Sequence, residues 1–202
     1  MAGCLIALEG IDKSGKETQT KLLKAWLESL GYKVETIAFP DYSTPIGKEI
    51  KAFLDGSRSF TVEVRQLLYV ANRWERKDDI ERWINEGKIV IADRYIPSGI
   101  AYGLANGLPL DWLLCLEEGL PKANLVIVMD ITVDTSFKRM GREKDRYERN
   151  RAFLERVRDS YLKLSKKFNW HVIDGERSVN DVFSDIKKIV ESFLKSHKRA
   201  FS

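Results

Sequence analysis

One loop near the N-terminus limits the possible folds of this chain more than any other feature. The loop has the sequence GIDKSGK, which runs from Gly10 to Lys16 and contains a second glycine, Gly15. The apolar residues 5–8 before the loop predict a buried strand, and residues 18–30 after it carry apolar side chains at helical spacing. A glycine-rich turn between a strand and a helix can point successive N–H groups at phosphate oxygens. The loop is therefore predicted to be a phosphate-binding loop (P-loop) rather than an ordinary turn.

The rest of the chain repeats the alternation of strand and helix. Near-continuous apolar runs, each followed by a helical pattern, occupy residues 5–8, 34–38, 89–92, 125–129 and 171–173. Such runs are typical of parallel strands that are buried on both faces. We expect an α/β fold of three layers, in which helices flank a five-stranded parallel sheet. Catalytic loops are expected at the carboxyl ends of the strands.

The first helix and a charged segment add detail to this fold. In the helix predicted over 18–30, one face carries Leu22, Leu23, Trp26, Leu27 and Leu30, and Gly31 is expected to cap the end. Residues 138–151 are dense in charge and are predicted to form a lid before a helix that ends near Phe168. With 202 residues and no linker or repeat, the chain is expected to be a single domain over 1–202.

Composition excludes several classes of function. The net charge is +4 and the charged runs mix signs, so we expect no nucleic-acid partner. No stretch approaches the roughly 18 apolar residues of a membrane span, so no membrane partner is expected. Cys4 and Cys115 lack metal-ligand spacing and suggest two buried thiols in a reducing compartment, so the expected location is the cytoplasm.

The P-loop predicts ATP and Mg²⁺ as ligands, with one departure from the usual motif. Lys16 can bridge the β- and γ-phosphates. Glu17 stands where a Ser or Thr hydroxyl usually binds Mg²⁺. Either Glu17 holds the metal, directly or through water, or it weakens ATP binding or turnover. The residues expected to bind ATP are Gly10, Ile11, Asp12, Lys13, Ser14, Gly15, Lys16, Glu17 and Thr18.

Four segments in this order resemble the thymidylate kinase family. They are LEGIDKSGK at 8–16, FPDYSTPIG at 39–47, LLYVANRWE at 67–75, and DRY at 93–95 continuing to Ser98-Gly99 and Ala101-Tyr102. The resemblance runs from Leu5 to about Asp174 and implies a P-loop fold of the nucleoside-monophosphate kinase type. It also implies transfer of the ATP γ-phosphoryl group to dTMP, which gives dTDP for dTTP synthesis. A homodimer is implied as well, with the apolar stretches 67–74 and 104–116 as candidate interface helices.

The resemblance implies a substrate-binding role for several residues. Asp12 is expected to accept a hydrogen bond from the 3′-hydroxyl, and Arg73 to clamp the thymine edge and help to hold the monophosphate. Tyr69 is expected to stack on the thymine ring, Phe39 to pack against it, and Tyr102 to crowd the 2′ position of the sugar. The remaining residues expected at the monophosphate site are Arg94, Ser98 and Tyr147.

The expected catalytic groups are cations and one carboxylate. Lys16 and Arg94 would neutralise charge on the transferring phosphoryl group, and Asp93 would organise Mg²⁺, for which Glu17 is the other candidate ligand. Arg142 is the expected lid cation, although the residues leave Lys13, Arg139 and Arg146 open as alternatives. In addition, Tyr42 stands where many relatives carry an Arg to the substrate phosphate.

Other interpretations remain open at this point. The aromatic residues also fit a plain core, Arg73 fits an exposed ion pair with Glu75 or Asp78, and Asp93 fits an ion pair with Arg94. Tyr102 also fits a surface position, and 138–151 a solvated helix start. The alternative functions are a kinase for another deoxynucleotide such as dUMP, and a nucleotide-binding protein that transfers no phosphate, which Glu17 favours.

Overall fold

The computed structural model describes residues 3–140 and 150–200, and its centre is the predicted sheet. Five parallel strands follow the order β2-β3-β1-β4-β5. Their bounds are Cys4–Glu9 (β1), Val34–Ala38 (β2), Ile89–Asp93 (β3), Leu125–Asp130 (β4) and His171–Asp174 (β5). The prediction of a five-stranded parallel sheet is confirmed. Burial on both faces holds for β1, β3 and β4, whereas the edge strands β2 and β5 are partly exposed.

Successive residues of β1 face opposite layers of the molecule. Leu5 and Ala7 belong to one buried cluster, while Cys4, Ile6 and Leu8 belong to another. This alternation follows from the pleat, because neighbouring side chains of a strand point to opposite faces. The sheet therefore separates two hydrophobic cores, one on each face.

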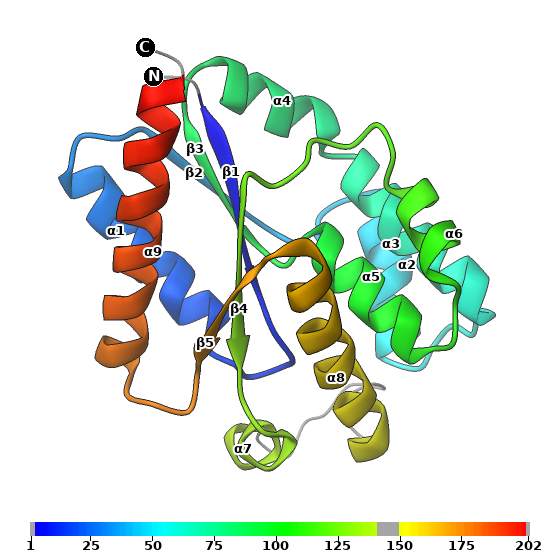
Figure 1. Cartoon of the computed structure of the whole chain (residues 1–202). Coiled ribbons are helices and arrows are strands. Elements are labelled where there is room, and N and C mark those ends of the chain that lie inside the picture. Colours follow the sequence, from blue (N-terminus) through cyan, green and yellow to red (C-terminus); the bar gives the residue numbers. More distant parts are fainter. Residues whose placement is uncertain (1–2, 141–149, 201–202) are drawn as a thin grey trace.

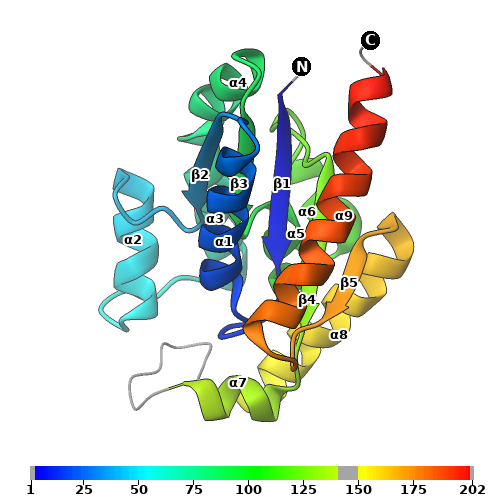
Figure 2. The same cartoon turned by 90° about the vertical axis from the view of Figure 1, so that its left-hand side faces the viewer.

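Two helices cover one face of the sheet. They are α1, Lys16–Ser29, and α9, Val179–Ala200, which lie side by side in Figures 1 and 2. Leu23 and Leu27 of α1 are fully buried, as predicted, but Leu30 is 55% exposed because the helix has ended before it. The predicted cap is confirmed: Gly31 has a φ of 83° and donates its N–H to the Glu28 carbonyl.

The opposite face carries the helices that will form the walls of the site. Helix α5 lies against α8, α6 and α3, and Figure 1 shows this group to one side of β1 and β4. The helices on this side are Pro45–Leu54 (α2), Val62–Trp74 (α3), Lys77–Asn85 (α4), Ile96–Ala105 (α5), Leu110–Leu116 (α6), Val133–Arg139 (α7) and Arg151–Phe168 (α8).

The carboxyl ends of β1 and β4 lie toward α7 and the start of α1 (Figure 2). Helix α8 ends at Phe168, as expected. Most of the predicted lid, residues 138–151, lies outside the described residues, so its role stays a prediction. Among the helices of the described ranges, none has the length and apolar content that a bilayer crossing requires.

Candidate active site

The P-loop connects β1 to α1 in a backbone conformation that favours glycine. Gly10 has a φ of 139° and Gly15 a φ of 95°. A Cβ at Gly10 would lie 2.5 Å from the carbonyl oxygen of Met129, so a side chain at this position would collide with β4. Lys13 also has a positive φ, 62°, at the tip of the loop. The loop therefore wraps closely over the end of the sheet.

Lys16 is held inside this loop. Its ammonium group donates to the carbonyls of Gly10, at 3.2 Å, and Ile11, at 2.9 Å, and to the Ser14 hydroxyl at 3.3 Å. Burial, together with the nearby Arg94 cation, lowers the pKa of Lys16 to about 8. Lys16 is thus a buried cation at the N-terminus of α1, where an anionic phosphate would relieve the cost of its burial.

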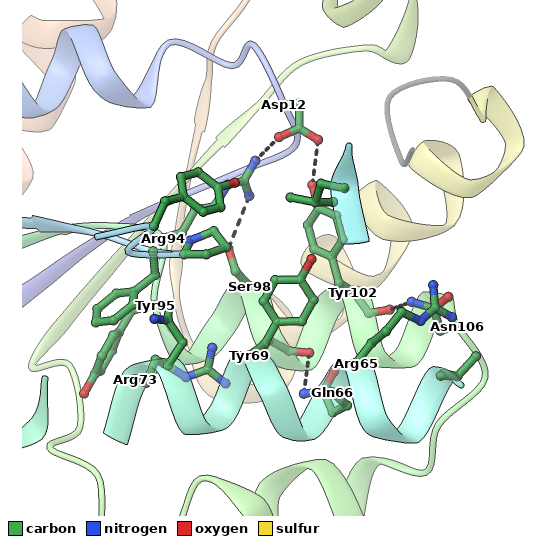
Figure 3. A pocket seen from close by; sticks show the side chains of 17 residues that line it. Asp12, Arg65, Gln66, Tyr69, Arg73, Arg94, Tyr95, Ser98, Tyr102 and Asn106 are labelled. Atoms are coloured by element: carbon green, nitrogen blue, oxygen red, sulfur yellow. Dashed lines mark hydrogen bonds and ion pairs between the residues drawn. The ribbon is translucent and has the colours of Figure 1, made fainter. Parts of the chain in front are cut away.

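Arg94 connects the P-loop to the first turn of α5. Its guanidinium forms an ion pair with Asp12 and donates to the Gly10 carbonyl at 2.9 Å and to the Ser98 hydroxyl at 3.3 Å. The Tyr102 hydroxyl donates to the other Asp12 oxygen at 3.0 Å (Figure 3). Burial acts to raise the pKa of Asp12, but the charges of Arg94 and Lys16 and the hydrogen bonds from Tyr102 and Arg94 together lower it. Asp12 is therefore an ionised carboxylate that accepts hydrogen bonds from both Arg94 and Tyr102.

These contacts decide between two interpretations of the Asp93-Arg94 pair. The carboxylate partner of Arg94 is Asp12, so the alternative of a local ion pair with Asp93 is wrong. Asp93 ends β3 beside Leu8 of β1, and its charge helps to keep Lys16 protonated. Asp93 thus lies at the carboxyl edge of the sheet, where the sequence placed it.

Beneath Arg94 lies a buried carboxylate that the sequence analysis missed. Glu9 is fully buried and accepts hydrogen bonds from the Tyr95 N–H at 2.8 Å, the Ser98 hydroxyl at 2.6 Å and the Tyr161 hydroxyl at 2.9 Å. Burial raises the pKa of Glu9, while the bond from Ser98 opposes this shift. A signal was present, because a carboxylate that ends an apolar strand needs partners. Glu9 fixes the start of α5 against α8.

A pocket opens between the P-loop, α3 and α5. Figure 3 shows Asp12 and Arg94 at one end of the pocket and Arg65 and Asn106 at the other, with the Tyr102 side chain between them. The substrate-binding residues predicted from the sequence line it wherever the structure describes them: Asp12, Phe39, Tyr69, Arg73, Arg94, Ser98 and Tyr102. Tyr42, Gln66, Tyr95 and Gly99 lie in the same lining. The structure therefore brings together residues from four separate segments.

Arg73 is buried rather than exposed. Its side chain is 3% exposed and forms an ion pair with Glu117, whose side chain is 4% exposed. The alternative of an exposed pair with Glu75 or Asp78 is wrong, because Arg73 faces α5 and the end of α6. Glu117 was missed, since a single Glu among the residues after α6 has no local pattern that marks it.

Asn72 holds the loop that follows β2. It is 1% exposed, accepts the Asp41 N–H at 2.8 Å, and donates to the Thr44 hydroxyl at 2.8 Å and to Glu75 at 3.1 Å. These bonds satisfy a buried amide and fix the loop that carries Phe39. The sequence segment 67–75 contained Asn72, but its role was not predicted.

The candidate metal ligands do not form a cage of protein groups. In the part of the chain that the structure describes, no cluster of three or more His, Cys, Asp or Glu side chains could hold a metal ion. The Glu17 side chain is 77% exposed and pairs with Lys21 at 2.6 Å, on the outer face of α1. Both interpretations of Glu17, as a metal ligand and as a residue that weakens ATP binding or turnover, stay predictions. Mg²⁺ is usually bound by one or two carboxylates together with substrate phosphates and water, so Asp93 stays a predicted ligand.

The base of the predicted lid contacts the P-loop. Ser136 of α7 donates to the Asp12 carbonyl at 2.7 Å, and Arg139 donates to the Lys13 carbonyl at 3.2 Å. Thr18 is exposed, as is the Lys13 side chain. The other predicted lid residues, Arg142, Arg146 and Tyr147, lie outside the described residues.

Comparison with known proteins identifies the family of this site. The family model described as thymidylate kinase matches residues 8–186. The chain belongs to the thymidylate kinase family. It is 34% identical to the human thymidylate kinase over 96% of this chain and 92% of the human protein. It is 37% identical to the thymidylate kinase of Schizosaccharomyces pombe over 94% of this chain and 92% of that protein.

A solved structure of a family member has the same fold. Thymidylate kinase from Candida albicans superposes with a TM-score of 0.85 at 34% sequence identity, over 95% of this chain and 92% of that chain. Thymidylate kinases are phosphotransferases that act on dTMP, so the predicted family and enzyme class are confirmed. The alternatives of another nucleotide kinase or a passive binding protein are not favoured.

Proposed function

We propose that the pocket between the P-loop, α3 and α5 binds dTMP and that the P-loop binds ATP, whose γ-phosphoryl group passes to dTMP. The observation that carries this proposal is the shared position of Asp12 and Arg94. Asp12 belongs to the P-loop and lines the pocket, while Arg94 lines the same pocket and donates to the P-loop carbonyl of Gly10. Donor and acceptor phosphates would therefore meet at Arg94.

The reaction needs positioning and charge neutralisation rather than a protein nucleophile. An oxygen of the dTMP phosphate attacks the γ-phosphorus, the bond from that phosphorus to the β–γ bridging oxygen breaks, and ADP leaves. Lys16 and Arg94 lie where they can stabilise negative charge on the transferring group. The products are dTDP and ADP, the first of which serves dTTP synthesis.

Within the pocket, each side chain has a proposed role. Tyr69 stacks on the thymine ring, Phe39 packs against that ring, and Arg73 donates to the base edge. Asp12 accepts the 3′-hydroxyl, and Tyr102, held by its bond to Asp12, excludes a 2′-hydroxyl. We propose Arg142 as the lid cation and Tyr147 as a further contact of the monophosphate.

Mg²⁺ supplies charge neutralisation and alignment of the triphosphate when it is bound. We propose that Asp93 holds it through water or directly, since Asp93 ends β3 beside the P-loop. Glu17 is assigned to the outer surface of α1, where its charge favours the helix N-terminus.

The quaternary state and location are also proposals. Helix α3 exposes apolar side chains, with Val64 at 40%, Leu67 at 46% and Trp74 at 42%. We propose a homodimer in which this face of α3 is covered, together with residues 104–116. We also propose a cytoplasmic location, which suits two free thiols: Cys4 is buried as expected, whereas Cys115 is exposed, so the expectation of two buried thiols is wrong for Cys115. Light scattering of the wild type and of Leu67→Glu tests the dimer: we expect the variant to be monomeric, and a monomeric wild type would exclude it.

The activity is tested by release of ADP from ATP with a panel of monophosphates. We expect dTMP to have the highest kcat/KM, about tenfold above dUMP, because its 5-methyl group packs against apolar side chains. Tyr69→Ala should raise the KM for dTMP about tenfold while the KM for ATP stays unchanged. Phe168→Ala, an aromatic 37% exposed at the far edge of the sheet, is the matched control. Binding of dTMP and ATP without any ADP release would refute the kinase.

A further inference from the structure

The pair of Arg73 and Glu117 has the geometry of a fixed clamp. The Arg73 Nε donates to Glu117 Oε2 at 3.0 Å, and its Nη2 contacts Oε1 of the same carboxylate. Two parallel bonds define the plane of the guanidinium as well as its distance. Both side chains are almost fully buried, at 3% and 4% exposure. A buried charge pair of this kind is costly to break, because one partner would be left uncompensated.

The surrounding fold is shaped to hold this clamp. Glu117 caps the C-terminus of α6, in a turn that Gly119 completes with a φ of 88°. A Cβ on Gly119 would lie 2.9 Å from the Trp74 ring, so α3 packs directly on this turn. A Cβ on Gly99 would lie 2.6 Å from Arg73 Nη2 and 3.0 Å from Glu117 Oε1. The backbone of α5 therefore approaches the pair closely on the opposite side.

The clamp determines which part of Arg73 is available to a ligand. Glu117 accepts from Nε and from one N–H group of Nη2, so the N–H groups of Nη1 and the second one of Nη2 remain for a ligand in the pocket that Arg73 lines. Figure 3 shows the guanidinium turned toward the space below Tyr69 and Ser98. The Glu117 charge also offsets that of Arg73, so this pair adds little net charge to the pocket. A neutral donor suits a base carbonyl better than a phosphate.

We propose that Glu117 is a positioning residue of the acceptor site: it fixes Arg73 so that one N–H group reads the nucleobase edge and leaves the phosphate to other cations. This inference rests on the proposed assignment of the pocket to dTMP. Glu117 touches no substrate and acts through Arg73 alone. It therefore controls the selection of the base rather than the chemical step.

The test compares Glu117→Gln with Glu117→Asp and with the exposed neighbour Glu118→Gln as control. Gln can accept only one of the two Arg73 bonds and carries no charge. We expect Glu117→Gln to raise the KM for dTMP about tenfold, with the KM for ATP and kcat within about twofold of wild type. Its preference for dTMP over dCMP should fall, because cytosine presents an amino donor where thymine presents a carbonyl. Glu118→Gln should behave as wild type.

Two further measurements separate positioning from a general structural role. Glu117→Asp keeps the charge and should recover most of the dTMP affinity. In an Arg73→Lys background, Glu117→Gln should add less than about twofold to the KM for dTMP, because its effect passes through the Arg73 fork. Equal rises in both KM values, or fully additive effects in the double variant, would overturn the inference, as would a Glu117→Gln enzyme with unchanged KM and base preference. A wild type that shows no saturable turnover of dTMP would instead overturn the assignment of the pocket.

Discussion

The guanidinium of Arg94 lies between the Asp12 carboxylate and the Tyr102 ring, 5.4 Å from the centre of that ring. One side chain thus connects the phosphate-binding loop to the wall of the acceptor pocket. Its backbone is in the left-handed region, with a φ of 66°, and its N–H donates to the Leu8 carbonyl at 3.0 Å. This unusual conformation turns the side chain away from Asp93, its neighbour in sequence, and toward the P-loop.

Replacement of Arg94 should affect the chemical step more than binding. Arg94→Lys loses the planar fork that contacts Asp12 and Gly10 together. We expect kcat to fall at least about a hundredfold, since stabilisation of the transferring group is lost. Steady-state kinetics check this, with Arg58→Lys as control for an exposed ion pair. A kcat near that of wild type would show that Arg94 does not contact the transferring group.

The titration of Lys16 should be visible in the binding of ATP. Burial lowers the pKa of Lys16 from its usual 10.5 to about 8. In the free enzyme, kcat/KM for ATP should therefore decline as the pH rises through about 8, because neutral Lys16 attracts phosphate less strongly. A profile that stays flat to pH 9.5, measured with dTMP saturating, would contradict this shift.

The same shift predicts a change in stability. Above pH 8 the folded state has released the Lys16 proton, while the unfolded state keeps it up to pH 10.5. The unfolded state then binds more protons, so the contribution of Lys16 to the free energy of unfolding rises with pH across this window. Urea titrations of wild type and Lys16→Met should diverge between these pH values, with the wild type gaining stability relative to the variant. Parallel curves would show that folding does not lower the pKa of Lys16.

The metal dependence should separate Asp93 from Glu17. Asp93→Asn removes a carboxylate at the end of β3 and should raise the Mg²⁺ concentration for half-maximal rate several-fold. Glu17→Gln should leave this concentration within about twofold of wild type, because the Glu17 side chain pairs with Lys21 on the surface of α1. Mg²⁺ titrations at fixed ATP decide between them. A larger effect in Glu17→Gln than in Asp93→Asn would reverse the assignment.

Ser136 offers a test of the contact between α7 and the P-loop. Its hydroxyl is buried and donates to the Asp12 carbonyl at 2.7 Å, so Ser136→Ala should cost about 1 kcal/mol of stability and raise the KM for dTMP. Ser165→Ala is the matched control, because that buried hydroxyl donates to the Tyr161 carbonyl at 2.8 Å within α8. Chemical denaturation and kinetics should show similar losses of stability but a change of KM in Ser136→Ala alone. Equal KM values in the two variants would mean that the contact does not set the position of Asp12.

The sequence allowed the sheet and most of the pocket lining to be predicted because their signals are local. Apolar runs mark the central strands, and the motif segments placed Asp12, Tyr69 and Arg73 in one site before any contact was known. The edge strand β2 was less well described, since side chains on both of its faces are partly exposed and the sequence run does not reveal this.

The residues that support the site could not be predicted in the same way. Glu9 and Tyr161 meet across 152 positions of the chain, and Arg73 and Glu117 across 44. Such pairs depend on how helices pack on the sheet, which no short spacing encodes. The outward position of Glu17 could not be predicted either. A carboxylate in the first turn of a helix can turn toward bound phosphates or toward Lys21, and the helical spacing allows both.

The central position of β1 has a consequence for the order in which the protein is completed during synthesis. β1 pairs with β3 on one edge and with β4 on the other. A nascent chain that has emerged as far as Asp93 already contains β1, β2 and β3, which are three adjacent strands of the sheet. It still lacks Met129, whose carbonyl packs against Gly10. β1 is therefore synthesised first, but the P-loop that follows it reaches its final shape only after β4 has been synthesised.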